Sequence, residues 1–163
     1  MINKDKIIRT FGKRFTQYMI DNNLRDVDMA RLLNMSSMNI PAYKNGSRLP
    51  NLWYLVLIAE KFDCKVNDLL GYGRCKIGSC FEREPATKKF SSINRYEMYL
   101  RNRLADAMNS KGISISELAI LVDRTEVTIR NNWLGDRPVT PNVYTFLDIC
   151  DALDYTPSDL LGY

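Results

Sequence analysis

Residues 66–72 read VNDLLGY, and residues 157–163, at the other end of the chain, read PSDLLGY. The likeness extends backwards from these endings: of the 23 pairs that align residues 50–72 with 141–163, nine are identical. Earlier in the chain the offset falls from 91 to 89 and matches continue. They are Arg14/Arg103, Met19/Met108, Ala30/Ala119, Leu32/Leu121, Ile40/Ile129 and Gly46/Gly135. A repeat this long predicts two similarly folded modules.

Length and composition agree with this division. A chain of 163 residues suits two small modules, and modules of about 65 to 70 residues bury only roughly 60% of their unfolded surface. No apolar run approaches the ~20 residues that span a bilayer, and the N-terminus lacks the apolar stretch of a signal peptide. We therefore expect a cytoplasmic protein that does not associate with membranes.

Charge is distributed unevenly along the chain. Residues 1–72 carry 11 Lys/Arg and 7 Asp/Glu, residues 73–92 carry 5 and 2, and residues 93–163 carry 7 and 10. A polyanionic partner would be drawn to the first module and the segment after it, and weakly repelled by the second module. Histidine, the commonest general base and metal ligand, is absent from the sequence. We therefore expect no enzyme, no cofactor and no metal site.

Hydrophobic periodicity predicts five helices in each module. The first helix ends near residues 22–23 in one module and near 111–112 in the other. The second helix covers residues 26–33 or 114–122, and Ser114 and Glu117 have the spacing of a capping box.

The connection to the third helix has the composition of a tight turn. Asn34 and Asp123 tolerate the left-handed conformation, and Ser36 and Thr125 are good N-caps. Gly46 and Gly135 lie where the third helix should end. A fourth helix is expected to run from residues 50–51 to about 62, or from 141–142 to 153, and the shared ending forms a fifth.

Two helices joined by a turn of three to four residues constitute a helix-turn-helix. At these residues the chain resembles the Cro/phage-repressor (XRE) family, in two tandem copies. The first copy shows Asp28-Met29-Ala30, Asn34-Met35-Ser36, Asn39-Ile40, Tyr43, Gly46 and Pro50. The second shows Ser116-Glu117-Leu118-Ala119, Asp123-Arg124-Thr125, Thr128-Ile129, Gly135 and Pro141. The resemblance implies an all-α fold of two five-helix lambda-repressor-like domains, residues 1–72 and 93–163, with a basic linker at 73–92.

The resemblance also implies binding of double-stranded DNA, with the third helix in the major groove and flanking groups on phosphates. The candidates in the first copy are Ser37, Met38, Asn39, Lys44, Asn45 and Arg48, with Pro41, Ala42 and Ser47 beside them. Those in the second copy are Thr125, Glu126, Thr128, Arg130, Asn131 and Arg137, with Val127 and Asp136 beside them. The alternative for each is a solvated helix face or loop, and a helix dipole alone explains a carboxylate at Glu126.

The two copies differ in their reading chemistry. Pro41 falls inside the third helix of the first copy, so that helix should start late, bend or be a single turn. In the second copy Arg130 can pair with guanine and Asn131 with adenine, each contributing roughly 1–3 kcal/mol of discrimination. Asn132 aligns with Tyr43, so an inserted residue would instead make Trp133 the core residue.

Aromatic residues and cysteines admit two interpretations each. Trp53, Tyr54 and Trp133 could stack on single-stranded bases, but aromatic residues at helical spacing are more often core, and we expect them there. Cys64 and Cys150 are expected to be small buried hydrophobes. Cys75 and Cys80 are spaced for a small disulfide loop or for half of a zinc site, and two ligands alone do not make such a site.

These features predict a transcriptional regulator that binds a specific DNA operator, most simply a repressor of phage or mobile-element type. Two modules on one chain could act as an intramolecular pseudo-dimer, since a flexible linker of this length spans on the order of 25 Å. A homodimer is the other arrangement. In the competing hypothesis one or both modules bind a protein, as an antitoxin, an anti-repressor or an inhibitor of a nucleic-acid enzyme such as an anti-CRISPR.

Overall fold

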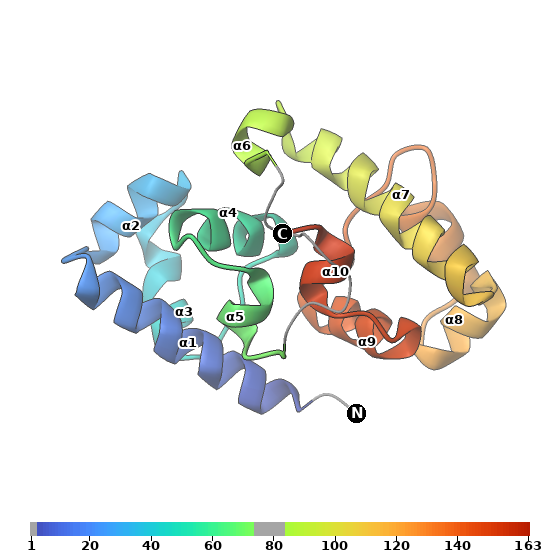
Figure 1. Ribbon diagram of the computed structural model, residues 1–163, viewed down its shortest axis with the longest axis horizontal. Helices are drawn as coiled ribbons and strands as arrows, with labels where there is room; N and C mark the ends of the chain where they lie inside the picture. Colours follow the sequence, from blue (N-terminus) through green and yellow to red (C-terminus); the bar gives the residue numbers. More distant parts are fainter. Residues whose placement is uncertain (1–2, 74–83) are drawn as a thin grey trace.

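The structure is a computed structural model that describes residues 3–73 and 84–163 (Figure 1). All regular elements in these two ranges are helices, and neither range contains a strand. The all-α class expected from the sequence is therefore confirmed. Within the same residues no helix has the length and apolar character needed to cross a membrane.

The first half of the chain, residues 3–73, and the second half, residues 93–163, contain helices in the same order. The first half has α1 (Lys4–Asp21), α2 (Asp26–Leu33), the 3₁₀ turn η1 (Ser37–Asn39), α3 (Ile40–Lys44), α4 (Leu52–Lys61) and α5 (Val66–Leu70). The second half has α7 (Ile93–Lys111), α8 (Ile115–Leu121), the π-helical segment η2 (Thr128–Trp133), α9 (Val143–Leu153) and α10 (Pro157–Leu161). The order agrees with the predicted repeat.

The turn before the third helix is built alike in both halves. Asn34 and Asp123 have φ values of 51° and 52°, in the left-handed region where Asn and Asp are tolerated. The hydroxyl of Ser36 accepts a hydrogen bond from Met38 N, and that of Thr125 accepts one from Thr128 N. The predicted left-handed turns and N-caps are confirmed.

The capping box expected at the start of α8 is present. Ser114 Oγ accepts a hydrogen bond from Glu117 N at 3.2 Å, and the Glu117 carboxylate accepts one from Ser114 N at 2.8 Å. The hydrogen bonds that Ser114 N and Ser114 Oγ donate to the Glu117 carboxylate lower its pKa. The charged carboxylate also faces the positive end of the helix dipole, so α8 begins where the sequence predicted.

Each half has an apolar core between its first and third helices. In the first half Phe11 and Phe15 stack at 5.5 Å between ring centroids, and Tyr43 meets both rings edge-on. All three are buried. In the second half Leu100, Leu104 and Trp133 are buried at the corresponding places.

Of the aromatic residues and cysteines predicted to be core, Cys150 is buried as predicted, whereas Trp53, Tyr54 and Cys64 lie at the edge of the core. Trp53 and Tyr54 are half-buried against the core. Cys150 is fully buried and Cys64 is half-buried, and both are free thiols. Burial raises the pKa of the Cys64 thiol to about 12. The predicted pairing or metal binding of Cys75 and Cys80 falls outside the described residues.

A short helix that the sequence did not predict, α6 (Ala86–Lys89), lies in the later part of the predicted linker. Its first backbone N–H, that of Ala86, donates to the Glu60 carboxylate of α4, and Thr87 Oγ1 is hydrogen-bonded to the same group at 3.5 Å. Ala86 is fully buried. A helix of this length is not stable alone, so its contact with α4 is what forms it.

The two halves contact each other through equivalent helices. α5 and α10 pack side by side between the halves (Figure 1). Asn67 N donates to Ser158 Oγ at 2.8 Å, and Ser158 N donates to Asn67 Oδ1 at 2.9 Å. Residues 67 and 158 are aligned in the repeat, so these hydrogen bonds are reciprocal, as in a two-fold interface.

Other contacts between the halves do not follow this symmetry. Val66 N donates to Tyr163 O at 3.4 Å, but Pro157, which is equivalent to Val66, has no N–H to make the matching bond. Trp53 of α4 packs on Tyr96 of α7 with ring centroids 5.2 Å apart. Tyr96 is fully buried and donates its hydroxyl proton to Leu161 O.

Candidate nucleic-acid interface

The third helix of the first half starts late because of Pro41. Ser37–Asn39 form the 3₁₀ turn η1, and Pro41 lies in the first turn of α3, where its missing N–H breaks no helical hydrogen bond. The prediction for this proline is confirmed. Ser37 is exposed, and Met38 is 85% exposed. The exposed start of the third helix therefore presents one hydroxyl group and one thioether to a DNA groove.

Lys44 at the end of α3 is held against the protein. Its Nζ lies 2.8 Å from Oδ1 of Asp26 at the start of α2, and Thr16 Oγ1 donates to Lys44 O at 3.3 Å. A lysine next to a carboxylate attracts a phosphate less strongly than an unpaired one. Arg48 is exposed in the following loop. Arg48 is therefore the stronger phosphate candidate of the two.

The start of α2 carries a second ion pair. Arg25 Nε lies 2.8 Å from Oδ2 of Asp28, and this hydrogen bond lowers the pKa of the Asp28 carboxyl to about 2. Asp28 is thus ionised at neutral pH. The negative charges of Asp26 and Asp28 offset the positive charges of Arg25 and Lys44. The surface at the start of α2 is therefore not strongly positive.

The third helix of the second half contains one extra residue. Leu134 N donates to Ile129 O at 2.9 Å, five residues back, which is π-helical spacing. Ile129 is fully buried and Trp133 is 6% exposed, whereas Asn132 is exposed. The predicted insertion, with Trp133 in place of Tyr43, is confirmed.

The wide turn of η2 explains the glycine that follows it. A Cβ at Gly135 would collide with the backbone carbonyl oxygen of Asn131. The φ angle of Gly135 is not in the left-handed region, unlike that of Gly46 at +67°. Gly135 is therefore required by a close backbone approach and Gly46 by its conformation.

A series of polar contacts links α8 to the third helix of the second half. Ser116 Oγ donates to Glu126 Oε1 at 2.6 Å, and Arg130 Nη2 lies 3.4 Å from Glu126 Oε2. The Arg130 side chain is 59% exposed. An exposed pair of this kind is weak, so Arg130 is oriented on the surface but can leave Glu126 for a stronger partner.

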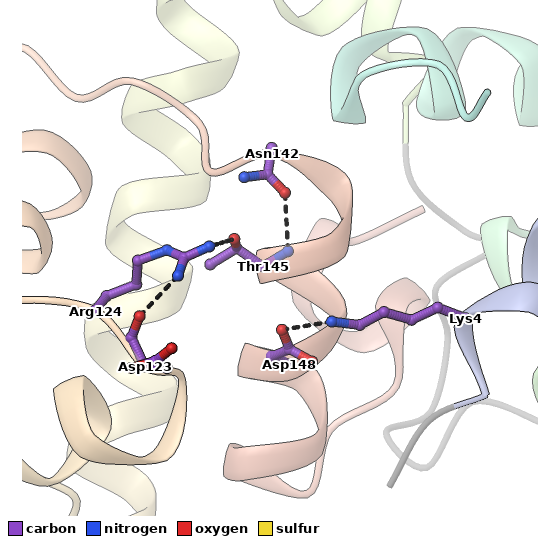
Figure 2. Close-up of polar contacts among 6 residues, drawn as sticks. All are labelled: Lys4, Asp123, Arg124, Asn142, Thr145 and Asp148. Atoms are coloured by element: carbon purple, nitrogen blue, oxygen red, sulfur yellow. Dashed lines mark hydrogen bonds and ion pairs between the residues drawn. The ribbon is translucent and has the colours of Figure 1, made fainter.

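The turn of the second half is tied to α9 through Arg124 (Figure 2). Its guanidinium donates to Asp123 O at 2.7 Å and to Thr145 Oγ1 at 2.9 Å. Asn142 caps α9 by accepting from Thr145 N at 3.0 Å. These hydrogen bonds hold the Arg124 side chain against the protein, so Arg124 is not a DNA-contact candidate.

Figure 2 also shows an ion pair between the halves. Lys4 Nζ of α1 lies 2.8 Å from Oδ2 of Asp148 on α9. Both side chains are more than a third exposed, so the pair contributes little to stability. It lies where the start of α1 comes close to α9.

The predicted DNA-contact residues divide between the two halves and differ in exposure. Those that are exposed are Ser37, Met38, Asn45, Arg48, Thr125, Arg130, Asn131 and Arg137. Those that are half-buried are Asn39, Lys44, Glu126 and Thr128. α2 and α8, which mark the two helix-turn-helix units, lie at opposite ends of the molecule (Figure 1). The partners Asp26 and Ser116 were missed because no sequence spacing relates them to Lys44 and Glu126.

Comparison with known proteins adds one finding. No curated protein and no solved structure matches the chain. Residues 103–163 match the family model described as the Cro/C1-type HTH DNA-binding domain. The matched segment contains α8, η2, α9 and α10, and with them every candidate residue of the second half. This part of the chain is therefore similar to the DNA-binding domains of the XRE-like helix-turn-helix family.

Proposed function

We propose that this protein is a transcriptional regulator that binds a specific double-stranded DNA sequence, most simply as a repressor. The observation that carries the proposal is the match of residues 103–163 to a DNA-binding helix-turn-helix, with Arg130 and Asn131 exposed on its third helix. Side chains of these two types can each hydrogen-bond bidentately to a base edge in the major groove.

We extend the proposal to the first half as a second domain of the same kind, residues 1–72, with residues 73–92 between the domains. Support comes from the shared helix order, the left-handed turns at Asn34 and Asp123 and the common ending of α5 and α10. The family match does not reach this half, so the support here is the internal repeat alone.

The two domains are proposed to act as an intramolecular pseudo-dimer. Support comes from the reciprocal hydrogen bonds of Asn67 and Ser158, a pattern expected at an approximate two-fold axis. A two-fold dimer of helix-turn-helix domains presents its third helices to half-sites about 34 Å apart. Because the third helices of the halves carry different side chains, they would contact their half-sites differently and the operator would be asymmetric.

Arg130→Ala is expected to lower specific affinity by roughly 1–3 kcal/mol, or about 5- to 150-fold, because a bidentate contact to guanine is lost. The measurement is fluorescence anisotropy on a duplex selected by the wild-type protein from a randomised pool. Arg124→Ala is the matched control, since Arg124 is also exposed but is bonded to Thr145.

Sequence preference should change with Arg130 and not with Arg124. If Arg130→Ala left the preference at every base pair unaltered, the second half would not be the reader. If the wild-type protein bound no duplex even at low salt, DNA binding itself would be refuted.

A second candidate function is protein binding, favoured by the surface around α8. Ile120 is 81% exposed and Leu121 is 56% exposed. Leu121 is also part of the lining of a groove of about 910 Å³. The lining residues are Asn3, Lys4, Asp5, Leu121, Val122, Asp123, Asp148, Asp151 and Ala152. Four carboxylates and one ammonium would repel DNA but complement a basic segment with apolar residues.

Ile120→Ser with Leu121→Ser is expected to weaken binding of an amphipathic helical peptide of Leu and Lys by about tenfold or more, since two apolar contacts are removed. Isothermal titration calorimetry would measure this. Leu32→Ser is the matched control, because Leu32 is equivalent to Leu121 and is 45% exposed on the first half. Equal losses in both variants would argue against the groove as the docking site.

A further inference from the structure

The exposed face of α1 carries a line of cations. Lys6, Arg9 and Lys13 follow one another at three and four residues, which places them on one side of the helix. All three are exposed, and the opposite side buries Ile7 and Phe11. Within residues 3–73 and 84–163 none of the three forms an ion pair. Their charge is therefore available to an external anion.

This cationic face adjoins the loop that follows α3. A Cβ at Gly46 would lie 3.4 Å from the Cα of Arg9, and a Cβ at Gly12 would lie 3.0 Å from Lys44 O. Thr16, one turn beyond Gly12, donates to the same carbonyl. Arg9, at the edge of the cationic face, thus lies against the start of residues 44–48, which hold the phosphate candidates Lys44 and Arg48.

The second half lacks this feature. The positions equivalent to Lys6, Arg9 and Lys13 are Arg95, Met98 and Asn102 on α7, so only one of the three charges is kept. The halves also differ in overall charge, with an excess of cations in residues 1–72 and of carboxylates in residues 93–163. The side chains best suited to reading bases, Arg130 and Asn131, belong instead to the second half.

We propose that Lys6, Arg9 and Lys13 form an additional phosphate-binding surface, continuous with residues 44–48, through which the first half holds the DNA backbone without reading sequence. The surface extends about 10 Å along α1. Duplex DNA carries one charge per ~1.7 Å of its axis, so this length faces several phosphates. The inference rests on the proposed function and assigns separate tasks to the halves: the first anchors and the second reads.

The test uses the full chain and two probes, a mixed-sequence duplex and the duplex selected by the wild-type protein. In the variant K6A/R9A/K13A the slope of log affinity against log salt should fall by about two to three, since each phosphate contact contributes ~0.9. Affinity at about 0.1 M salt should weaken roughly 10- to 100-fold on both probes. The ratio of the two affinities should stay as in the wild type.

The control variant K88A/R95A/K111A removes the same number of cations from α6 and α7, and its salt slope should change by less than about one. Lys6→Arg with Lys13→Arg should keep the wild-type slope, and thermal melting shows whether each variant is folded. An unchanged slope in K6A/R9A/K13A, or an equal change in the control, would overturn the inference while leaving DNA binding intact. Failure of the wild type to bind either duplex would remove the proposed function as well.

Discussion

Trp133→Ala should lower the free energy of unfolding by about 3–5 kcal/mol, the range for truncating a large buried aromatic residue. Trp133 ends η2, is 6% exposed and lies in the core with Leu100 and Leu104. Small domains have a free energy of unfolding of only about 5–15 kcal/mol, so this substitution would remove a large part of the stability of the second half. Urea unfolding followed by far-UV circular dichroism would measure the loss.

The same substitution should also reduce DNA binding, because Trp133 anchors the segment that presents Arg130 and Asn131. Deletion of Asn132 is the informative comparison. It removes the residue that the π turn accommodates and leaves Trp133 in the core, so the protein should stay folded with a regular α-helical third helix. A loss below about 1 kcal/mol for Trp133→Ala, typical of surface positions, would contradict the role of Trp133 in the core.

Asn67→Leu should cost about 3 kcal/mol, because it removes the buried hydrogen bonds that the Asn67 side chain makes to Ser158 N and Thr156 Oγ1 of the other half. The Asn67 side chain accepts from Ser158 N at 2.9 Å and donates to Thr156 Oγ1 at 3.0 Å and Gly73 O at 3.1 Å. The residue is 1% exposed. Differential scanning calorimetry should show a lower melting temperature and a broader transition as the halves uncouple.

Asn102→Leu is the matched control, since Asn102 is exposed on α7 and the same change there should alter stability by less than about 0.5 kcal/mol. Ser158→Ala tests the other side of the pair and should be destabilising, because it removes the buried hydrogen bond from Asn67 N to Ser158 Oγ. Equal melting curves for Asn67→Leu and Asn102→Leu would mean that the contact between α5 and α10 does not couple the halves.

Local features were predictable from the sequence because each depends on residues close together in the chain. The left-handed turns at Asn34 and Asp123 and the capping box of Ser114 are of this kind. The effect of Pro41 is another, since the missing N–H acts on its own helix. Even the displaced core position of Trp133 could be predicted, because Asn132 is too polar to occupy the site that Tyr43 fills.

Other features could not be predicted, because they join distant segments. α6 forms only where Glu60 accepts its first N–H, and the ion pair of Lys44 with Asp26 depends on how α3 packs beside α2. The first orders residues 86–89 on α4. The second bears on the candidate site, because it weakens Lys44 as a phosphate contact relative to Arg48.

The sequence by itself determined the all-α class and the repeated order of helices, because hydrophobic period, turn residues and caps recur at offsets of 89 and 91 residues. Only the tertiary structure decided that α5 and α10 join the halves through Asn67 and Ser158, and that α1 lies against the loop after α3 at Arg9 and Gly12. Such contacts depend on packing between elements far apart in the chain, where a residue's neighbours follow from the whole fold and not from its place in the sequence.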